Sequence, residues 1–325
     1  MSKRFAIVSV GTNSTRLLLA DVAPAIPRMQ TARSVGTRLG EGLGEQGRLG
    51  DEPMQRTLEA IGQFQREVKG HYIRLFAVAT SALRRAKNGE EFSQRVQALL
   101  GTPLRILSGE EEAEASYRGA LTVLGELRGE RVGVLDAGGG STEYAIGTST
   151  EPEKLITCEI GAVRVTEAVP ELAGRDGTVA EAAVERALAM ARKALEPLAE
   201  CATVERLALV GGTATTIAGI VRGRRTPIHS CDLTREDLQR TLERLLAMPI
   251  EERKKVAGMK PQRADILPGG IIVIETAMEI VGSDKAVATS SDLLLGILLQ
   301  ERDASAGQPQ VVYTKASETR GRFRP

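Results

Sequence analysis

Two segments of the chain, offset by 127 residues, share one pattern of strand, glycine-rich turn and strand. The first is AIVSVGTNSTRLLLADV (residues 6–22), and the second is GVLDAGGGSTEYAIG (residues 133–147). They align without a gap and place Gly11 on Gly138 and Ser14 on Ser141. A repeat at this distance predicts two domains of like topology, because the units of a solenoid recur every 20–50 residues or so.

The segments around the two copies alternate between strand and helix patterns. Apolar spacing predicts a helix over residues 54–70, then a buried strand over 73–80. The later helices are expected at 89–101, 110–125, 178–200, 233–248, 268–282 and 292–301, with short strands at 104–109 and 204–210. We expect Thr178 and Thr234 to cap two of these helices. Strands that alternate with helices predict an α/β fold, and two such halves predict a ligand cleft between them.

The composition excludes several classes of partner. The chain has 325 residues, 42 % hydrophobic and 26 % charged, with a formal net charge of +1. This balance gives no reason to expect nucleic acid or a membrane as partner. The apolar run at 269–277 is too short to span a bilayer, and the one near the N-terminus is too short for a secretory signal. The three cysteines show no metal-ligand spacing. We therefore expect a cytoplasmic protein.

Three glycine-rich turns follow predicted strands and could hold phosphate. They are GTNST (11–15), DAGGGSTE (136–143) and VGGTATT (210–216). Glycines let backbone N–H groups approach an anion closely, and Ser and Thr hydroxyls add donors. None of the turns fits the Walker A pattern, and each alone is typical of an ordinary hairpin. Two aligned copies and a third turn favour phosphate binding.

Asp136 ends its strand just before the glycines of the second turn. A phosphate there repels this carboxylate unless a cation lies between them, so Asp136 is a candidate ligand for Mg²⁺ or another hard divalent cation such as Mn²⁺. Glu143 lies past the turn and faces the same cleft in this interpretation. The alternative is a solvent-exposed turn aspartate.

An ordered set of motifs resembles one known family over almost the whole chain, up to about Gly296. The motifs are AIVSVGTNSTRLLLADV, TRLGEGLGEQGRL, AVATSALRRAKN, ILSGEEEAEASYRGA, VLDAGGGSTEYAI, IGAVRVTE, LVGGTATTIAG, LTREDL and QRADILPGGIIVI. Together they resemble the exopolyphosphatase/guanosine pentaphosphate phosphatase (Ppx/GppA) family, in its short two-domain form.

The resemblance implies duplicated ribonuclease H-like domains of the sugar kinase–actin–chaperone superfamily, with an interdomain cleft. We expect domain I at 1–125 plus about 297–310, domain II at 126–296, and a flexible tail at 303–325. Relatives with this architecture often dimerise, so the resemblance also allows a homodimer.

The resemblance assigns roles to individual residues. It makes Glu112 the base that orients or deprotonates the attacking water, and it places Asp136 and Glu143 as metal- and water-site carboxylates. Arg84 is expected to contact the phosphate chain, whereas its neighbour Arg85 is expected at the surface. The expected phosphate-binding residues are Gly11, Thr12, Asn13, Ser14, Arg84, Gly138, Gly139, Gly140, Ser141, Gly211, Gly212 and Thr213. Without the resemblance, the three carboxylates at 110–112 indicate only the solvent-exposed start of a helix.

One position departs from the family pattern. The repeat aligns Ser9 with Asp136, and the family usually has Asp at both places. A serine is a poor ligand for magnesium compared with a carboxylate. The loss weakens metal binding or slows catalysis, unless Asp136 and Glu143 compensate for it.

The sequence thus favours a magnesium-assisted phosphoanhydride hydrolase. Its expected substrates are inorganic polyphosphate, in short chains above all, and guanosine pentaphosphate. The alternative is a weakly active or inactive protein that binds polyphosphate or an alarmone as a regulator, because Ser9 replaces the expected Asp. A phosphotransferase of the sugar or acetate kinase type is disfavoured, because no sugar-binding signature is present.

Overall fold

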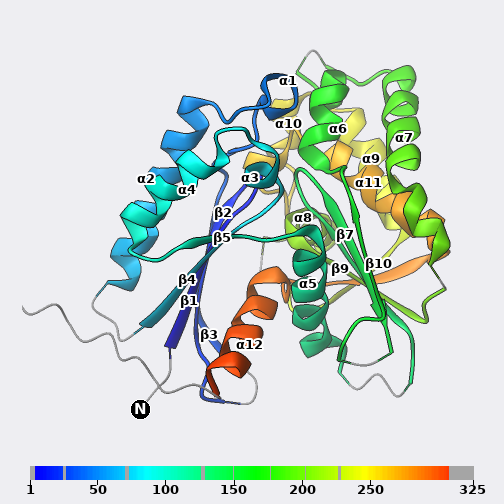
Figure 1. Ribbon diagram of the computed structural model, residues 1–325. Coiled ribbons are helices and arrows are strands. Elements are labelled where there is room, and N and C mark those ends of the chain that lie inside the picture. Colours follow the sequence, from blue (N-terminus) through cyan, green and yellow to red (C-terminus); the bar gives the residue numbers. More distant parts are fainter. Residues whose placement is uncertain are drawn as a thin grey trace, which may run out of the picture.

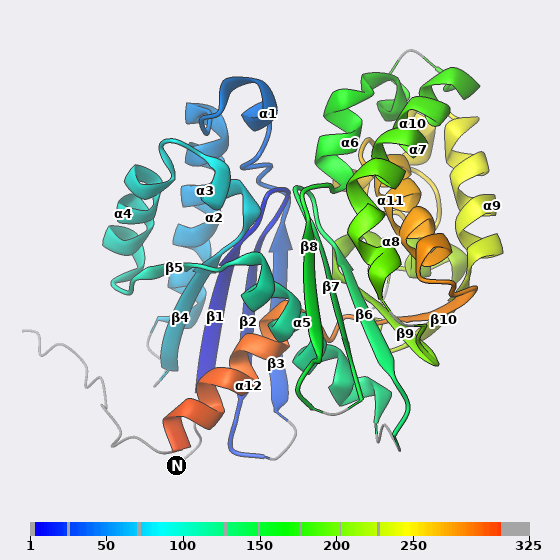
Figure 2. The same ribbon diagram turned by 45° about the vertical axis from the view of Figure 1, so that its right-hand side comes forward.

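The computed structural model describes residues 4–24, 27–69, 73–125, 129–148, 150–175, 177–201, 203–225 and 228–306. Two mixed β-sheets lie side by side, and helices cover both (Figures 1 and 2). The α/β fold expected from the sequence is confirmed. No helix among the described residues is long and apolar enough to cross a membrane.

The first sheet has the strand order β3-β2-β1-β4-β5. Its strands are β1 (Arg4–Val10), β2 (Thr15–Asp21), β3 (Arg28–Val35), β4 (Ile73–Ala79) and β5 (Leu104–Ile106). Alternate side chains of β1 enter two different cores, as expected for a strand buried on both faces. Val8 belongs to the core that contains residues of α2 (Asp51–Val68) and α4 (Gly89–Leu100). Ile7 belongs to the core under α12 (Leu293–Ala306).

The second sheet repeats this arrangement, with the order β10-β11-β9-β6-β7-β8. Its strands are β6 (Val132–Ala137), β7 (Thr142–Gly147), β8 (Lys154–Cys158), β9 (Arg206–Val210), β10 (Cys231–Thr234) and β11 (Lys285–Ala288). In each sheet three successive strands form an antiparallel meander, and the next strand runs parallel to the first of them. The repeat found in the sequence is therefore a repeat of topology.

Helices α5 (Gly109–Leu124) and α12 connect the two halves. α5 packs on β6, β7 and β8 of the second sheet and also on α12, which packs on β1 of the first. Figures 1 and 2 both show these two helices in contact between the sheets. The domain boundary expected at residue 125 stays a prediction. It falls just after α5, a helix that belongs to the core of the second sheet.

The remaining helical segments surround the sheets. They are α1 (Leu43–Gln46), α3 (Ser81–Arg85), α6 (Ala162–Ala168), η1 (Pro170–Ala173), α7 (Glu181–Leu195), η2 (Glu196–Glu200), α8 (Gly211–Val221), α9 (Arg235–Leu246), α10 (Ile250–Arg253), η3 (Pro261–Arg263) and α11 (Leu267–Ile280). α8 and α11 pack on the side of the second sheet opposite α5, where their apolar residues join the largest core of the molecule.

Three local expectations are corrected. Thr178 does not cap α7, which begins at Glu181 after Ala180 and has no side-chain cap. No turn separates β9 from α8, because the helix begins directly at Gly211. Residues 303–306 are the last residues of α12, so the expected tail starts later, and residues 307–325 lie outside the described residues. Thr234 does cap α9, through a capping box with Asp237.

Candidate active site

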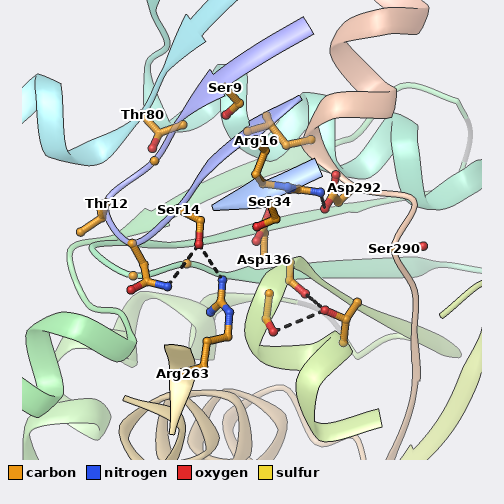
Figure 3. A pocket seen from close by; sticks show the side chains of 18 of the residues that line it. Ser9, Thr12, Ser14, Arg16, Ser34, Thr80, Asp136, Arg263, Ser290 and Asp292 are labelled. Carbon is orange, nitrogen blue, oxygen red and sulfur yellow. Dashed lines mark hydrogen bonds and ion pairs between the residues drawn. The ribbon is translucent and has the colours of Figure 1, made fainter. Parts of the chain in front are cut away.

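A cavity of about 450 Å³ lies where the two hairpin turns meet. Its lining comes from both halves of the molecule, as Figure 3 shows for ten labelled residues. The expected site residues in the lining are Gly11, Thr12, Asn13, Ser14, Glu112, Asp136, Gly138, Gly139, Gly140, Ser141, Glu143, Gly211 and Gly212. The structure therefore brings together residues that are far apart in the sequence.

The two turns have the same backbone and touch each other. Gly11 N donates to Ser14 O at 3.0 Å, and Gly138 N donates to Ser141 O at the same distance. A Cβ on Gly139 would lie 3.2 Å from the Thr12 Cβ, and one on Gly140 would lie 2.7 Å from the Thr12 Oγ1. Glycine is needed at residue 140 because the first turn packs directly against the second.

The helix start at residues 109–112 separates the roles of its three glutamates. Glu111 accepts a hydrogen bond from Ser108 N and completes the capping box, and Glu110 is exposed. Glu112 is buried, with 7 % of its surface exposed, and lines the cavity. Among these neighbours, Glu112 alone is placed for chemistry in the cavity.

Arg84 is the cationic partner of Glu112. It lies at the end of α3, donates to Leu107 O at 2.7 Å and forms an ion pair with Glu112. It does not line the cavity, so the expected contact between Arg84 and a phosphate chain stays a prediction. Burial raises the pKa of Glu112 to about 7, and Arg84 opposes this shift. A carboxylate with this pKa can accept a proton near neutral pH.

Asp136 and Glu143 face each other across β6 and β7. Ser116 Oγ donates to Asp136 Oδ2 at 2.7 Å. Burial is the main cause that raises the pKa of Asp136 to about 6, and the Asp292 carboxylate adds to it. Burial and the charges of Glu112 and Asp136 raise the pKa of Glu143 well above its usual value. A cation between these acids would stabilise their ionised forms.

The carboxylate oxygens of Asp136 and Glu143 suit a hard divalent cation. Within the described residues no group of three or more His, Cys, Asp or Glu side chains could hold a metal ion by itself. Mg²⁺ is nonetheless commonly bound by one or two carboxylates, with water and substrate phosphate as the other ligands. Glu143 Oε1 is buried and has no hydrogen-bond partner, which leaves it available as such a ligand.

Gly211 and Gly212, in the third glycine-rich segment, leave room for Asp136 and Arg263 to lie close to the backbone. Gly211 has φ +87°, and a Cβ there would lie 2.6 Å from Asp136 Oδ1. A Cβ on Gly212 would collide with the Arg263 guanidinium. Thr213 does not line the cavity, so the expectation that it binds phosphate stays a prediction. Its hydroxyl donates to Ala137 O at 3.2 Å.

Five charged residues of the cavity lining were missed from the sequence, namely Arg16, Arg225, Lys260, Arg263 and Asp292. Arg16 forms an ion pair with Asp292 at 2.7 Å, and Arg263 Nη2 donates to Ser14 Oγ at 3.3 Å (Figure 3). Lys260 Nζ donates to Thr215 Oγ1 at 3.0 Å. The repeat offered a signal for Arg16, because the same offset aligns it with Glu143. No comparable pattern singles out Lys260 or Arg263.

Two of the missed cations, Lys260 and Arg263, are half-buried in the lining of the cavity. Burial lowers the pKa of Arg263 to about 10, and burial together with Arg263 and Arg16 lowers that of Lys260 to about 8. Across the described parts of the chain, neither forms an ion pair within 4.0 Å. Partly buried cations without an ion-pair partner favour a counter-charge, so an anionic ligand in this cavity would stabilise both.

Arg85 is not simply a surface residue. Its side chain is 26 % exposed, and its Nε lies 3.7 Å from Glu159 Oε2, across the gap between the two halves. Arg85 lines a second cavity of about 670 Å³, which shares Thr12 and Asn13 with the first.

Comparisons with known proteins agree with this geometry. The model of the Ppx/GppA phosphatase family matches residues 20–301. The chain is similar to exopolyphosphatase 2 of Mycobacterium tuberculosis, with 33 % identity over 91 % of this chain and 98 % of that protein. It is also similar to a guanosine-5′-triphosphate,3′-diphosphate pyrophosphatase of Aeromonas hydrophila, with 28 % identity over 94 % of this chain and 61 % of that protein.

A solved structure supports the same relationship. The crystal structure of the Aquifex aeolicus member of the Ppx/GppA family has a TM-score of 0.76 and 27 % identity, and the match covers 95 % of this chain and 100 % of that one. The two meander sheets and the cavity between their turns thus have the actin-like architecture that the family resemblance implies. The chain belongs to the Ppx/GppA phosphatase family.

Proposed function

We propose that this chain removes the terminal phosphate from inorganic polyphosphate or guanosine pentaphosphate by attack of water. One observation carries the proposal. A single cavity holds the buried carboxylate of Glu112, the two glycine turns and the half-buried cations Lys260 and Arg263, which form no ion pair within the described residues. A polyphosphate fits this pattern, because its terminal group reacts and its other phosphates need compensating positive charge.

Glu112 is the base in this mechanism. Its carboxylate accepts a hydrogen bond from the attacking water and takes up the proton as the phosphorus–oxygen bond of the nucleophile forms. Arg84 keeps the carboxylate directed into the cavity. The backbone N–H groups of the turns and the Ser14 and Ser141 hydroxyls bind the phosphate oxygens, and the anhydride oxygen leaves with the shortened chain. This arrangement explains why the catalytic carboxylate is buried.

Asp136 and Glu143 would hold a divalent cation such as Mg²⁺. When bound, the cation would neutralise charge on the phosphate oxygens as the anhydride bond breaks. The Oε1 of Glu143, which has no hydrogen-bond partner and lies 4.0 Å from Arg84 Nη2, and the raised pKa values of both residues support this role.

The names of the two relatives indicate two substrate classes. Exopolyphosphatase 2 is named for polyphosphate, and the pyrophosphatase is named for a guanosine nucleotide. The cavity, at about 450 Å³, has space for only a few phosphate groups, so we propose that short polyphosphates are used at least as well as long ones.

The test is phosphate release from tripolyphosphate and guanosine pentaphosphate with Mg²⁺. Glu112→Gln should reduce release by about 10²–10⁴-fold, the usual contribution of a general base. Glu110→Gln is the matched control, since this neighbour is exposed, and it should leave the rate unchanged. Equal rates in the two variants would overturn the assignment of Glu112.

Ser9 favours a second candidate function, a binding protein with little turnover. Ser9 is buried and lines the cavity at the position that the repeat aligns with Asp136. In that case the unmodified chain binds tripolyphosphate but releases no phosphate beyond the Glu112→Gln background. Release well above that background excludes this candidate.

A further inference from the structure

The segment of residues 36–42, here called the clasp, connects the first phosphate turn to the opposite half of the molecule. The sequence motif TRLGEGLGEQGRL contains it, and the proposed mechanism gives it no role. On one side Arg38 N donates to Asn13 O at 3.0 Å, and Gly40 N donates to Thr12 O at 2.9 Å. The clasp therefore occupies the carbonyl oxygens of the turn.

On its other side the clasp contacts the segment that carries the half-buried cations Lys260 and Arg263. Arg38 Nη1 donates to Asp265 Oδ2 at 2.6 Å, and Arg38 Nη2 donates to Asp265 Oδ1 at 2.9 Å and to Gln262 O at 3.2 Å. Asp265 is 6 % exposed. This paired geometry fixes direction as well as distance. Arg263 lies between the two residues that Arg38 holds.

The backbone of Arg38 is unusual. Its φ of +51° is the one positive value found for a residue other than glycine in the described parts of the chain. Residues with a full side chain rarely adopt this conformation, and it persists where the surroundings impose it. Here it lets a single residue contact the turn through its backbone and the opposite half through its side chain. Gly42 N adds a parallel contact, to Glu167 Oε1 at 2.9 Å.

We propose that Arg38 is a positioning residue, which sets Arg263 and Lys260 at the correct distance from the first phosphate turn. Arg38 contacts neither cation, and acts through Gln262 and Asp265. This inference rests on the proposed function, because those cations bind the phosphates that do not react. Loss of Arg38 should therefore weaken binding of the substrate and leave the chemical step, at Glu112, almost unchanged.

The experiment compares KM and kcat for tripolyphosphate in Arg38→Asn, Asp265→Asn and the double variant. Asn tolerates the left-handed backbone, so Arg38→Asn removes the side-chain contacts without adding backbone strain. We expect KM to rise by about tenfold or more, and kcat to change by less than about threefold. The double variant should show no more than about twice the effect of either single one, because both remove the same pair.

Arg206→Gln is the matched control. Arg206 is 31 % exposed, as Arg38 is, but it pairs with Glu130 and the Leu124 carbonyl within its own half. This variant should keep the KM of the unmodified chain. Arg38→Lys retains the charge but not the paired donors, and should give an intermediate KM. In a chain that already carries Arg263→Gln, the further change Arg38→Asn should not raise KM again.

The inference is overturned if KM in both Arg38→Asn and Asp265→Asn stays within twofold of the unmodified chain. It is also overturned if the two effects multiply in the double variant. A merely structural role would lower the thermal midpoint and the active fraction and leave KM unchanged. If the unmodified chain releases no phosphate, the proposed function fails. The dissociation constant of tripolyphosphate, measured by calorimetry, then tests the same variants without turnover.

Discussion

The two hairpins of the repeat have the same backbone and opposite charge. Each turn is closed by a glycine N–H on a serine carbonyl, and each hairpin continues into a third antiparallel strand. The register pairs Ser9 with Arg16 in the first hairpin and Asp136 with Glu143 in the second. The equivalent positions are therefore neutral and cationic in one half, and both anionic in the other.

This difference separates two tasks within one cavity. The backbone N–H groups of both turns can bind phosphate whatever side chains flank them. The acidic pair of the second hairpin lies near Glu112, and the first hairpin places Arg16 and Ser14 near Arg263 and Lys260. A phosphate chain that spans the cavity would thus react at its acidic side and be held at its cationic side.

Substitution at equivalent positions should show the largest difference between the hairpins. Asp136→Asn should reduce phosphate release by about 10²-fold or more, because it removes a proposed metal ligand. Ser9→Ala, at the equivalent position, should change the rate by less than about threefold, because a neutral group is replaced by another. Initial rates at saturating Mg²⁺ measure both. Comparable losses in the two variants would show that the hairpins share the task equally.

The pH dependence should report the burial of Glu112. Its pKa is raised to about 7, and the base must be ionised to accept a proton. We expect kcat/KM to fall about tenfold per pH unit below pH 7 and to level off above it. Arg84→Met should move this limb to higher pH, because Arg84 stabilises the ionised form. The assignment of Glu112 as the base would be contradicted if the acidic fall of kcat/KM were centred below pH 5. It would also be contradicted if the same fall persisted in Glu112→Gln.

A carboxylate at residue 9 should make the hairpins more alike. Ser9→Asp adds an oxygen ligand beside the cavity, so the Mg²⁺ concentration for half-maximal rate should fall by about tenfold. Ser9→Asn is the control, because it has similar size and no charge. An unchanged Mg²⁺ requirement in Ser9→Asp would mean that Arg16 pairs with the new carboxylate and keeps it from the metal.

Much of this architecture could be predicted from the sequence, because repeats and apolar spacing are local patterns. The aligned turns predicted the two hairpins and the like topology of the halves but not the third strands β3 and β8, and Gly138–Ser141 reproduce the hydrogen bond of Gly11–Ser14. The glutamate that faces the cavity followed from the family motif. Its burial and the capping role of Glu111 required the packing of α5 on the second sheet.

Other features depend on long-range packing that has no local signature. Lys260 and Arg263 line the cavity, and Arg38 contacts their segment from more than two hundred residues away in the chain. The contacts of Thr213 and Thr215 likewise depend on packing that no local pattern shows. α8 starts without a preceding turn, so the Thr213 hydroxyl is directed to Ala137 O and the Thr215 hydroxyl meets Lys260. The residue at which a glycine-rich helix begins, and therefore the direction of its side chains, cannot be predicted from composition.

The smallest predicted effect concerns what the hairpins share. Thr15 Oγ1 lies 2.8 Å from Thr37 Oγ1, and Thr142 Oγ1 donates to Ile160 O at 2.7 Å. Thr15 pairs with Val35 and Thr142 with Cys158, so each threonine reaches two residues beyond its strand partner. The two threonines occupy equivalent positions, although one bond joins two hydroxyls and the other ends on a backbone carbonyl, and both side chains are fully or almost fully buried.

Replacing either threonine by valine keeps the shape and leaves its partner without a hydrogen bond. Each change should lower the free energy of unfolding by about 1–2 kcal/mol, the cost of a buried unsatisfied polar group. Denaturant titration of the two variants should give values within about 0.5 kcal/mol of each other. A large difference would mean that the halves hold their turns by different means. Equal costs, together with unequal effects at residues 9 and 136, would show that the repeat retained its scaffold while its chemistry diverged.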